Sequence, residues 1–226
     1  MVNQSKPSIK DTQIQFNKNL IKWFKKNGRS FLWREKRDPY KVFVAELLLK
    51  RTTCTAAHRV YQQFIEKYPD LMVLSKASIA NLENELKPIG LHKQRAKGIK
   101  EATAYLFESC SGKFPKKFND LLKIPHVGNY SAACILSFGM DIPAPAIDAN
   151  GQRVLSRVFK NTLGDDISLE KILDFSWGLV PQKDHVLFNY GLIDLGTLLC
   201  TYRGCSKELC PLCKICDEFI IIKKNP

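Results

Sequence analysis

Two carboxylates are the residues best suited to chemistry. Glu46 lies in the apolar run "FVAELLLK", where a carboxylate is expected to be paired or functional because burying an isolated charge is costly. A functional Glu46 would protonate a leaving group or position a water. The alternative is an exposed glutamate that pairs with Lys50 one turn later. Asp148 follows Pro143 and Pro145 and enters "ANGQRVL", so it is either only a helix cap or a rigidly held catalytic group.

A second candidate site is the stretch "IPHVGNYSA", residues 124–132. A proline, a short turn and a glycine stand immediately before a run of helix formers. One interpretation is a surface turn that begins a helix. The other is a cradle of backbone N–H groups that binds a phosphate without reading base sequence.

The third candidate site is the cysteine-rich end of the chain. Five of the eight cysteines fall within 17 residues, at 200, 205, 210, 213 and 216. In an intracellular protein this density indicates metal ligands rather than disulfides. Cys210, Cys213 and Cys216 form a C-x2-C-x2-C run similar to that of ferredoxins. Zinc also binds thiolates, and spacing alone does not separate it from iron.

Composition and charge narrow the kind of partner. The chain has 226 residues, 45% of them apolar and 25% charged, which is typical of a globular protein. No apolar run has membrane-spanning length and the N-terminus lacks the apolar core of a signal peptide, so we expect an intracellular, cytoplasmic protein. The net charge of +13 favours a polyanion, most plausibly nucleic acid.

The elements that must position these residues are predicted to be helices throughout. Asp38 and Pro39 mark the N-cap and first position of the helix that carries Glu46, and Ser78 is a candidate cap of "SIANLENELKPIG". No segment alternates with period two, so the sequence predicts a compact all-α protein. In the N-terminal helix, which ends at Gly28, the spacing predicts one apolar face made of Ile14, Leu20, Ile21 and Phe24.

Four of these features, in this order, resemble the helix-hairpin-helix (HhH-GPD) DNA glycosylase superfamily, of the endonuclease III-like type with an iron–sulfur loop. "DPYKVFVAELLLKRTT" is similar to the family helix with an active-site glutamate, and "IGLHKQRAKGI" to its Gly-Leu wedge loop. The hairpin is followed by a helix and a loop with one aspartate, Asp148. The fourth feature is the cysteine loop. The family's first hairpin glycine is His126 here, a residue that tolerates a positive φ better than most.

The resemblance implies base excision repair of DNA. Such enzymes act on a base that has left the stack and hydrolyse its N-glycosidic bond through an oxocarbenium-like transition state. Asp148 matches the carboxylate that stabilises this state, and Glu46 matches the active-site glutamate. Tyr130 stands where relatives that also cut the strand carry a Schiff-base lysine. The expected activity is therefore that of a monofunctional glycosylase without strong lyase activity; the alternative for Tyr130 is a residue that only packs at the pocket wall.

The resemblance also suggests which residues contact double-stranded DNA. Leu91 would be the wedge that fills the gap left by the flipped base, or else a core leucine at a helix start. Lys50 and Arg51 would lie near the estranged guanine, whose O6 and N7 accept hydrogen bonds. The expected DNA-binding residues are His126, Val127, Gly128, Lys50, Arg51, Leu91 and Asn150.

The predicted substrate is thymine or uracil mispaired with guanine. "RTT" at 51–53, "IGLHKQRA" and "DANGQRV" are similar to the archaeal-type G·T mismatch enzymes. Adenine glycosylases, the alternative, typically read Gln-Gln-Thr at 50–52 and usually continue into an extra C-terminal domain. A more distant alternative is a non-catalytic DNA-binding or redox module on the same scaffold.

The resemblance implies a 4Fe–4S cluster, with zinc as the alternative metal. Relatives space their ligands as C-x6-C-x2-C-x5-C, which would place the second ligand at Lys207. Four of the five cysteines would bind: either Cys200, Cys205, Cys210 and Cys216, or the three of the C-x2-C-x2-C run with Cys200 or Cys205. Lys207 and Lys214 are candidate phosphate contacts.

The expected architecture has two helical lobes in a monomer. Residues 30–141 would form a six-helix barrel that ends in the hairpin. Residues 1–29 and 142–226 would form the second lobe, with the cluster loop at 200–216.

Overall fold

The computed structural model describes residues 8–205 and 208–224, and the fold is all-α as the sequence predicts. Contacts divide the chain into two compact units, Ser30–Ile142 and Met1–Arg29 with Pro143–Pro226. Each unit is described by itself. None of the described helices is long and apolar enough to cross a bilayer.

The unit Ser30–Ile142 is built on a central helix, α2 (Pro39–Leu49), which packs against α3, α6, α8 and η3. As predicted, Asp38 caps α2 by accepting a 3.0 Å hydrogen bond from the Lys41 N–H, and Pro39 occupies the first turn. Ser78 caps α5 in the same way. The other elements are η1 (Leu32–Arg34), α3 (Cys54–Lys67), α4 (Leu71–Lys76), α5 (Ile79–Leu86), η2 (Lys87–Ile89), α6 (His92–Cys110), α7 (Phe118–Leu121), α8 (Asn129–Cys134) and the π-helical turn η3 (Ile135–Gly139).

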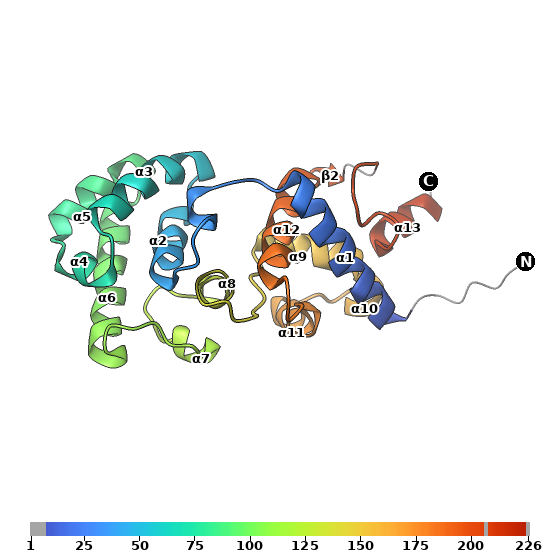
Figure 1. Cartoon of the computed structure of the whole chain (residues 1–226). Coiled ribbons are helices and arrows are strands. Elements are labelled where there is room, and N and C mark those ends of the chain that lie inside the picture. The colour runs from blue at the N-terminus through green and yellow to red at the C-terminus, as the bar shows by residue number, and fades with distance from the viewer. Residues whose placement is uncertain (1–7, 206–207, 225–226) are drawn as a thin grey trace, which may run out of the picture. The chain divides into compact units, whose positions relative to one another are not determined.

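The second unit joins the N-terminal helix to the C-terminal third of the chain. Helix α1 (Ile9–Asn27) packs along α12 (His185–Leu198), which in turn packs on α9 (Ala149–Val158) (Figure 1). The remaining elements are α10 (Lys160–Leu163), α11 (Leu169–Leu179), α13 (Asp217–Lys224) and the two short antiparallel strands β1 (Cys200–Thr201) and β2 (Gly204–Cys205).

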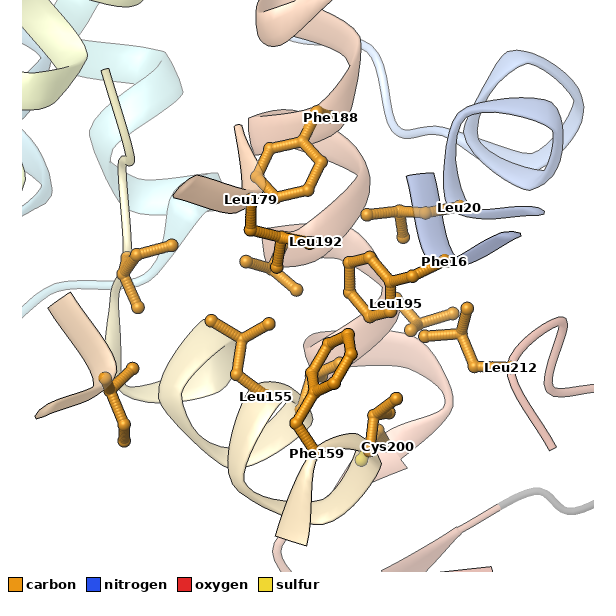
Figure 2. Close-up of a cluster of buried hydrophobic side chains, with 14 of the residues drawn as sticks. Phe16, Leu20, Leu155, Phe159, Leu179, Phe188, Leu192, Leu195, Cys200 and Leu212 are labelled. Atoms are coloured by element: carbon orange, nitrogen blue, oxygen red, sulfur yellow. The ribbon is translucent and has the colours of Figure 1, made fainter. Parts of the chain in front are cut away.

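One apolar core holds this second unit together (Figure 2). Phe16 lies against Phe159 and Phe188, with ring centroids 5.2 and 6.1 Å apart. Cys200 and Leu212 of the cysteine-rich segment belong to the same core, so that segment is packed on the helices. The predicted face of α1 is partly wrong: Ile14 is 60% exposed, whereas Phe16, which was not predicted to face the core, is fully buried.

Candidate functional site

Asp148 is the N-cap of α9, and hydrogen bonds hold both of its carboxylate oxygens. Oδ1 accepts from the Gly151 N–H at 2.7 Å, and Oδ2 accepts from Asn150 Nδ2 at 2.9 Å. The side chain is only partly buried. A capping carboxylate in this arrangement has one orientation and an accessible face, so capping does not preclude chemistry.

The loop before Asp148 is fixed by a buried amide. Asn189 of α12 is fully buried; its Nδ2 donates to the Ala144 carbonyl at 2.9 Å and its Oδ1 accepts from the Ala146 N–H at 3.0 Å. Two prolines in the same loop, Pro143 and Pro145, restrict φ. Asp148 is therefore presented from a rigid segment.

Arg153 connects the Asp148 loop to the cysteine-rich segment. Its Nη2 donates to Asn150 Oδ1 and to the Gly196 carbonyl, each at 2.7 Å, and its Nε donates to the Cys200 carbonyl at 2.7 Å. Asn150 in turn donates to Asp148. A continuous set of hydrogen bonds thus links the Asp148 carboxylate to the backbone of Cys200.

The hairpin combines a residue of left-handed backbone with an exposed glycine. His126 adopts a left-handed backbone with φ 65°, and Val127 is buried beneath the turn. Gly128 is exposed and caps α8, which begins at Asn129, so a helix follows the glycine as predicted. A Cβ built on Gly128 would meet nothing within 4 Å, so its backbone is open to a ligand.

Glu46 and Tyr130 lie in the same unit as the hairpin. Glu46 is 8% exposed, in the middle of the buried face of α2, so the alternative of an exposed glutamate does not hold. Tyr130 is half-buried in the first turn of α8, the helix that packs against α2. Asp148 belongs to the other unit.

The predicted DNA-contact residues Lys50, Arg51, Leu91 and His126 line one cavity of about 560 Å³ within the unit Ser30–Ile142. Leu91 is 43% exposed with φ 53°, so it is not a core leucine. Arg51 also has a positive φ, 51°. Strained backbone of this kind clusters at functional sites.

Buried Arg95 donates hydrogen bonds to two segments that border this cavity, the C-terminal end of α2 and the turn at Gly90. Its Nη1 donates to the Leu47 carbonyl at 2.6 Å, its Nε to the Gly90 carbonyl at 2.9 Å, and its Nη2 to the Lys50 carbonyl. Burial lowers the pKa of the Arg95 guanidinium. The end of α2 and the wedge loop are thus held by one side chain.

Four thiols face one cavity in the second unit. A cavity of about 190 Å³ is lined by Cys200, Cys205, Cys210 and Cys216, together with other residues. The backbones of Cys200 and Cys205 are opposite each other in the β1–β2 ladder, and both thiols are free. Cys213 is not among the lining residues and packs on the apolar core. Burial raises the pKa of Cys210 to about 12 and that of Cys216 to about 11.

Four thiols that line one cavity are a donor set that could hold a metal ion or an iron–sulfur cluster. Across residues 8–205 and 208–224, no group of three or more His, Cys, Asp or Glu side chains is arranged to hold a metal ion. Arg157 donates to Cys200 Sγ at 3.3 Å, which would stabilise a thiolate there. Lys214 is exposed, and Lys207 lies outside the described residues.

Sequence reasoning missed the residues that hold the site together, namely Arg95, Arg153 and Asn189. Arg153 had a signal, because residues three apart on a helix are neighbours and it follows Asn150 by three. Arg95 and Asn189 bond mainly to backbone carbonyls and N–H groups. Those partners are chosen by the tertiary fold and leave no mark in the sequence.

Comparison with known proteins agrees with this geometry. Residues 44–177 match the model of the HhH-GPD superfamily base excision DNA repair protein family. Thymine/uracil-DNA glycosylase of Pyrobaculum aerophilum is 32% identical over 203 residues, covering 88% of each chain. Adenine DNA glycosylase of Buchnera aphidicola subsp. Schizaphis graminum is 31% identical, covering 90% of this chain and 59% of that protein. The solved structure of a thermostable thymine-DNA glycosylase superimposes with a TM-score of 0.88 at 28% identity, covering 95% of this chain and 100% of that one. The chain belongs to the HhH-GPD superfamily of base excision DNA repair proteins.

Proposed function

We propose that this protein is a monofunctional DNA glycosylase that hydrolyses the N-glycosidic bond of thymine or uracil mispaired with guanine. The observation that carries the proposal is the similarity, over nearly the whole chain, to proteins named for thymine and uracil excision. The rigidly held, accessible carboxylate of Asp148 supports it. The product would be an abasic site in the repair of deaminated cytosine or methylcytosine.

The chain's own groups supply the steps of such a reaction. The flipped nucleotide develops positive charge at the sugar as the base departs, and the oriented Asp148 carboxylate stabilises it. Glu46, buried on α2, is suited to position water or to protonate the leaving base. Tyr130 has no amine, so it cannot form a Schiff base, and strand cleavage by that route is not expected.

The hairpin and the basic surface provide DNA binding. Backbone N–H groups near Gly128 would bind a phosphate, with His126 and Val127 shaping the turn. Leu91 would enter the gap left by the flipped base, while Lys50 and Arg51 read the opposite guanine. Asn150, which donates a hydrogen bond to Asp148, would also contact the DNA. The unit Ser30–Ile142 would be the six-helix barrel, and the protein would bind DNA as a monomer.

We further propose that Cys200, Cys205, Cys210 and Cys216 hold a 4Fe–4S cluster, with zinc as the alternative. The cavity between these four thiols supports this choice over the set that includes Cys213. The cluster would serve mainly to fold a segment with little core of its own.

The test is release of bases from defined duplexes. Purified protein is incubated with duplexes that hold one G·T, G·U, A·G or A·oxidised-G pair, and free bases are measured. We expect thymine and uracil release from the pairs with guanine. Release of adenine alone would instead support an adenine glycosylase, which the 31% identity to such an enzyme keeps as the second candidate.

Asp148→Asn separates catalysis from binding. Asparagine is also a good N-cap, so the helix start and the fold should persist. We expect DNA binding to be kept while the base-release rate falls by about 10²-fold or more. Unchanged release would remove Asp148 from the mechanism, and absence of release by the unmodified protein would favour a non-catalytic DNA-binding or redox module.

A further inference from the structure

His126 stands at the position that matches the first hairpin glycine of the family. Its φ of 65° lies in the region that glycine occupies freely and other residues rarely adopt. A non-glycine side chain is unfavourable there unless it makes compensating contacts. The contacts of the His126 side chain should therefore show what compensates for its unfavourable backbone conformation.

The imidazole of His126 is fixed to α6. Its Nε2 lies 2.6 Å from Glu101 Oε2, and this hydrogen bond is the main reason why the pKa of Glu101 is lowered. The ring also lies over Gly98: a Cβ built on Gly98 would be 3.2 Å from His126 Cδ2. The absence of a side chain at position 98 thus gives the ring its place on the helix.

The backbone of His126 in turn holds Lys50. The Lys50 ammonium donates to the His126 carbonyl at 2.5 Å. At its other end, the Lys50 carbonyl accepts from buried Arg95. Lys50 is consequently fixed at both its backbone and its charged end, and a long flexible side chain is restricted to one conformation.

Lys50 stands at the edge of the 560 Å³ cavity, beside Arg51 and Leu91. Cavities of this size hold small organic groups such as a nucleobase. Arg51, Leu91 and His126, three residues with left-handed backbone, all line it. An ammonium is only a donor, so it can pair with both O6 and N7 of guanine, whereas adenine offers it N7 alone because its N6 amino group is itself a donor.

We propose that His126 and Glu101 are positioning residues that fix Lys50 for recognition of the base opposite the excised one. The inference rests on the proposed glycosylase function and adds to it a device that the family pattern of a hairpin glycine does not contain. His126 holds Lys50 through its carbonyl, and Glu101 keeps the hairpin in the register that presents this carbonyl.

The test measures opposite-base discrimination, defined as the single-turnover rate of uracil release opposite guanine divided by that opposite adenine. In His126→Gly the backbone is relieved of strain, so the melting temperature should not fall on that account. The variant keeps the carbonyl that accepts from Lys50 but loses the Nε2–Glu101 hydrogen bond that anchors the hairpin. We expect discrimination to fall by about fivefold or more, because the carbonyl is no longer held in place for Lys50. Glu101→Ala, an exposed change on the other side of the same hydrogen bond, should give a similar fall.

A double-mutant cycle distinguishes positioning through Lys50 from a general effect. Lys50→Met should itself lower discrimination, and adding His126→Gly to Lys50→Met should lower it no further. Lys93→Met removes an equal charge from an exposed site on α6 that does not line the cavity, so it is the matched control and should leave discrimination unchanged.

Three outcomes would overturn the inference. Discrimination could be unchanged in both His126→Gly and Glu101→Ala, or the loss in His126→Gly could add fully to that in Lys50→Met, or Lys93→Met could reduce it equally. A different result would defeat the proposed function instead: no release of thymine or uracil by the unmodified protein from any duplex. A fourth outcome, discrimination that is unaffected by Lys50→Met, would leave the glycosylase proposal standing and remove only the positioning role.

Discussion

At the scale of single residues, the proposed function makes Tyr130 the residue that would separate base release alone from base release with strand cleavage. It is half-buried in the first turn of α8, directly after the hairpin. A phenol at this position permits hydrolysis of the glycosidic bond but provides no amine to attack the sugar. The type of one side chain thus separates base release alone from base release with strand cleavage.

Tyr130→Lys should therefore add a new activity. We expect strand cleavage and a covalent complex with uracil-containing DNA that borohydride reduction traps, because a lysine amine can form the imine. Tyr130→Phe, the matched control, should release uracil without cleavage or trapping. If Tyr130→Lys folds, releases uracil and is never trapped, position 130 does not face the sugar.

At the scale of elements, α9 is the helix on which the candidate site of the second unit depends. Its N-cap is Asp148, its first turn carries Asn150, and Arg153 reaches from it to the Cys200 carbonyl. Helix α12 lies so close that a Cβ on Gly196 would be 2.7 Å from Asn150 Cβ and 2.9 Å from its carbonyl oxygen. Glycine at 196 is what allows the two helices to approach at the Asp148 loop.

Gly196→Ala should displace the start of α9. We expect destabilisation by about 1–3 kcal/mol from overpacking, and a larger loss of uracil release than of DNA binding, because Asn150 would no longer hold Asp148. Chemical denaturation and single-turnover rates measure the two effects. Gly178→Ala, at an exposed position of α11, places a Cβ that meets nothing within 4 Å, and the higher helix propensity of alanine should stabilise the protein by up to about 1 kcal/mol. Equal behaviour of the two variants would contradict this account of Gly196.

At the scale of the whole chain, the cysteine-rich segment and the N-terminal helix share one core. Cys200, Cys210 and Leu212 belong to the same buried cluster as Phe16 and Leu20 of α1 (Figure 2). Residues nearly two hundred positions apart in the sequence therefore stabilise each other. A metal held by this segment would stabilise the whole unit, beyond its own loop.

The four-thiol proposal makes a direct prediction about metal content. Cys205→Ser should lose iron, its visible absorption and several degrees of melting temperature, because a ligand is removed and the unit loses its cross-link. Cys213→Ser should retain all three, since Cys213 does not line the cavity. Iron and zinc in the purified proteins are measured by elemental analysis. The reverse pattern would assign the ligands to the C-x2-C-x2-C run, and zinc in place of iron would change the metal but not the ligands.

The sequence by itself determined the all-α class and the helix starts at Asp38 and Ser78, because these follow from local spacing and capping chemistry. Its resemblance to known motifs indicated the family. The sequence identified the types of the candidate residues but left open whether Glu46 and Leu91 are buried. It also left open which cysteines share a cavity, and it placed the wrong residue, Ile14, on the buried face of α1. Only the tertiary structure decided these points. Burial of a side chain and the backbone partners of Arg95, Arg153 and Asn189 depend on segments distant in sequence, and no local pattern encodes which segments meet.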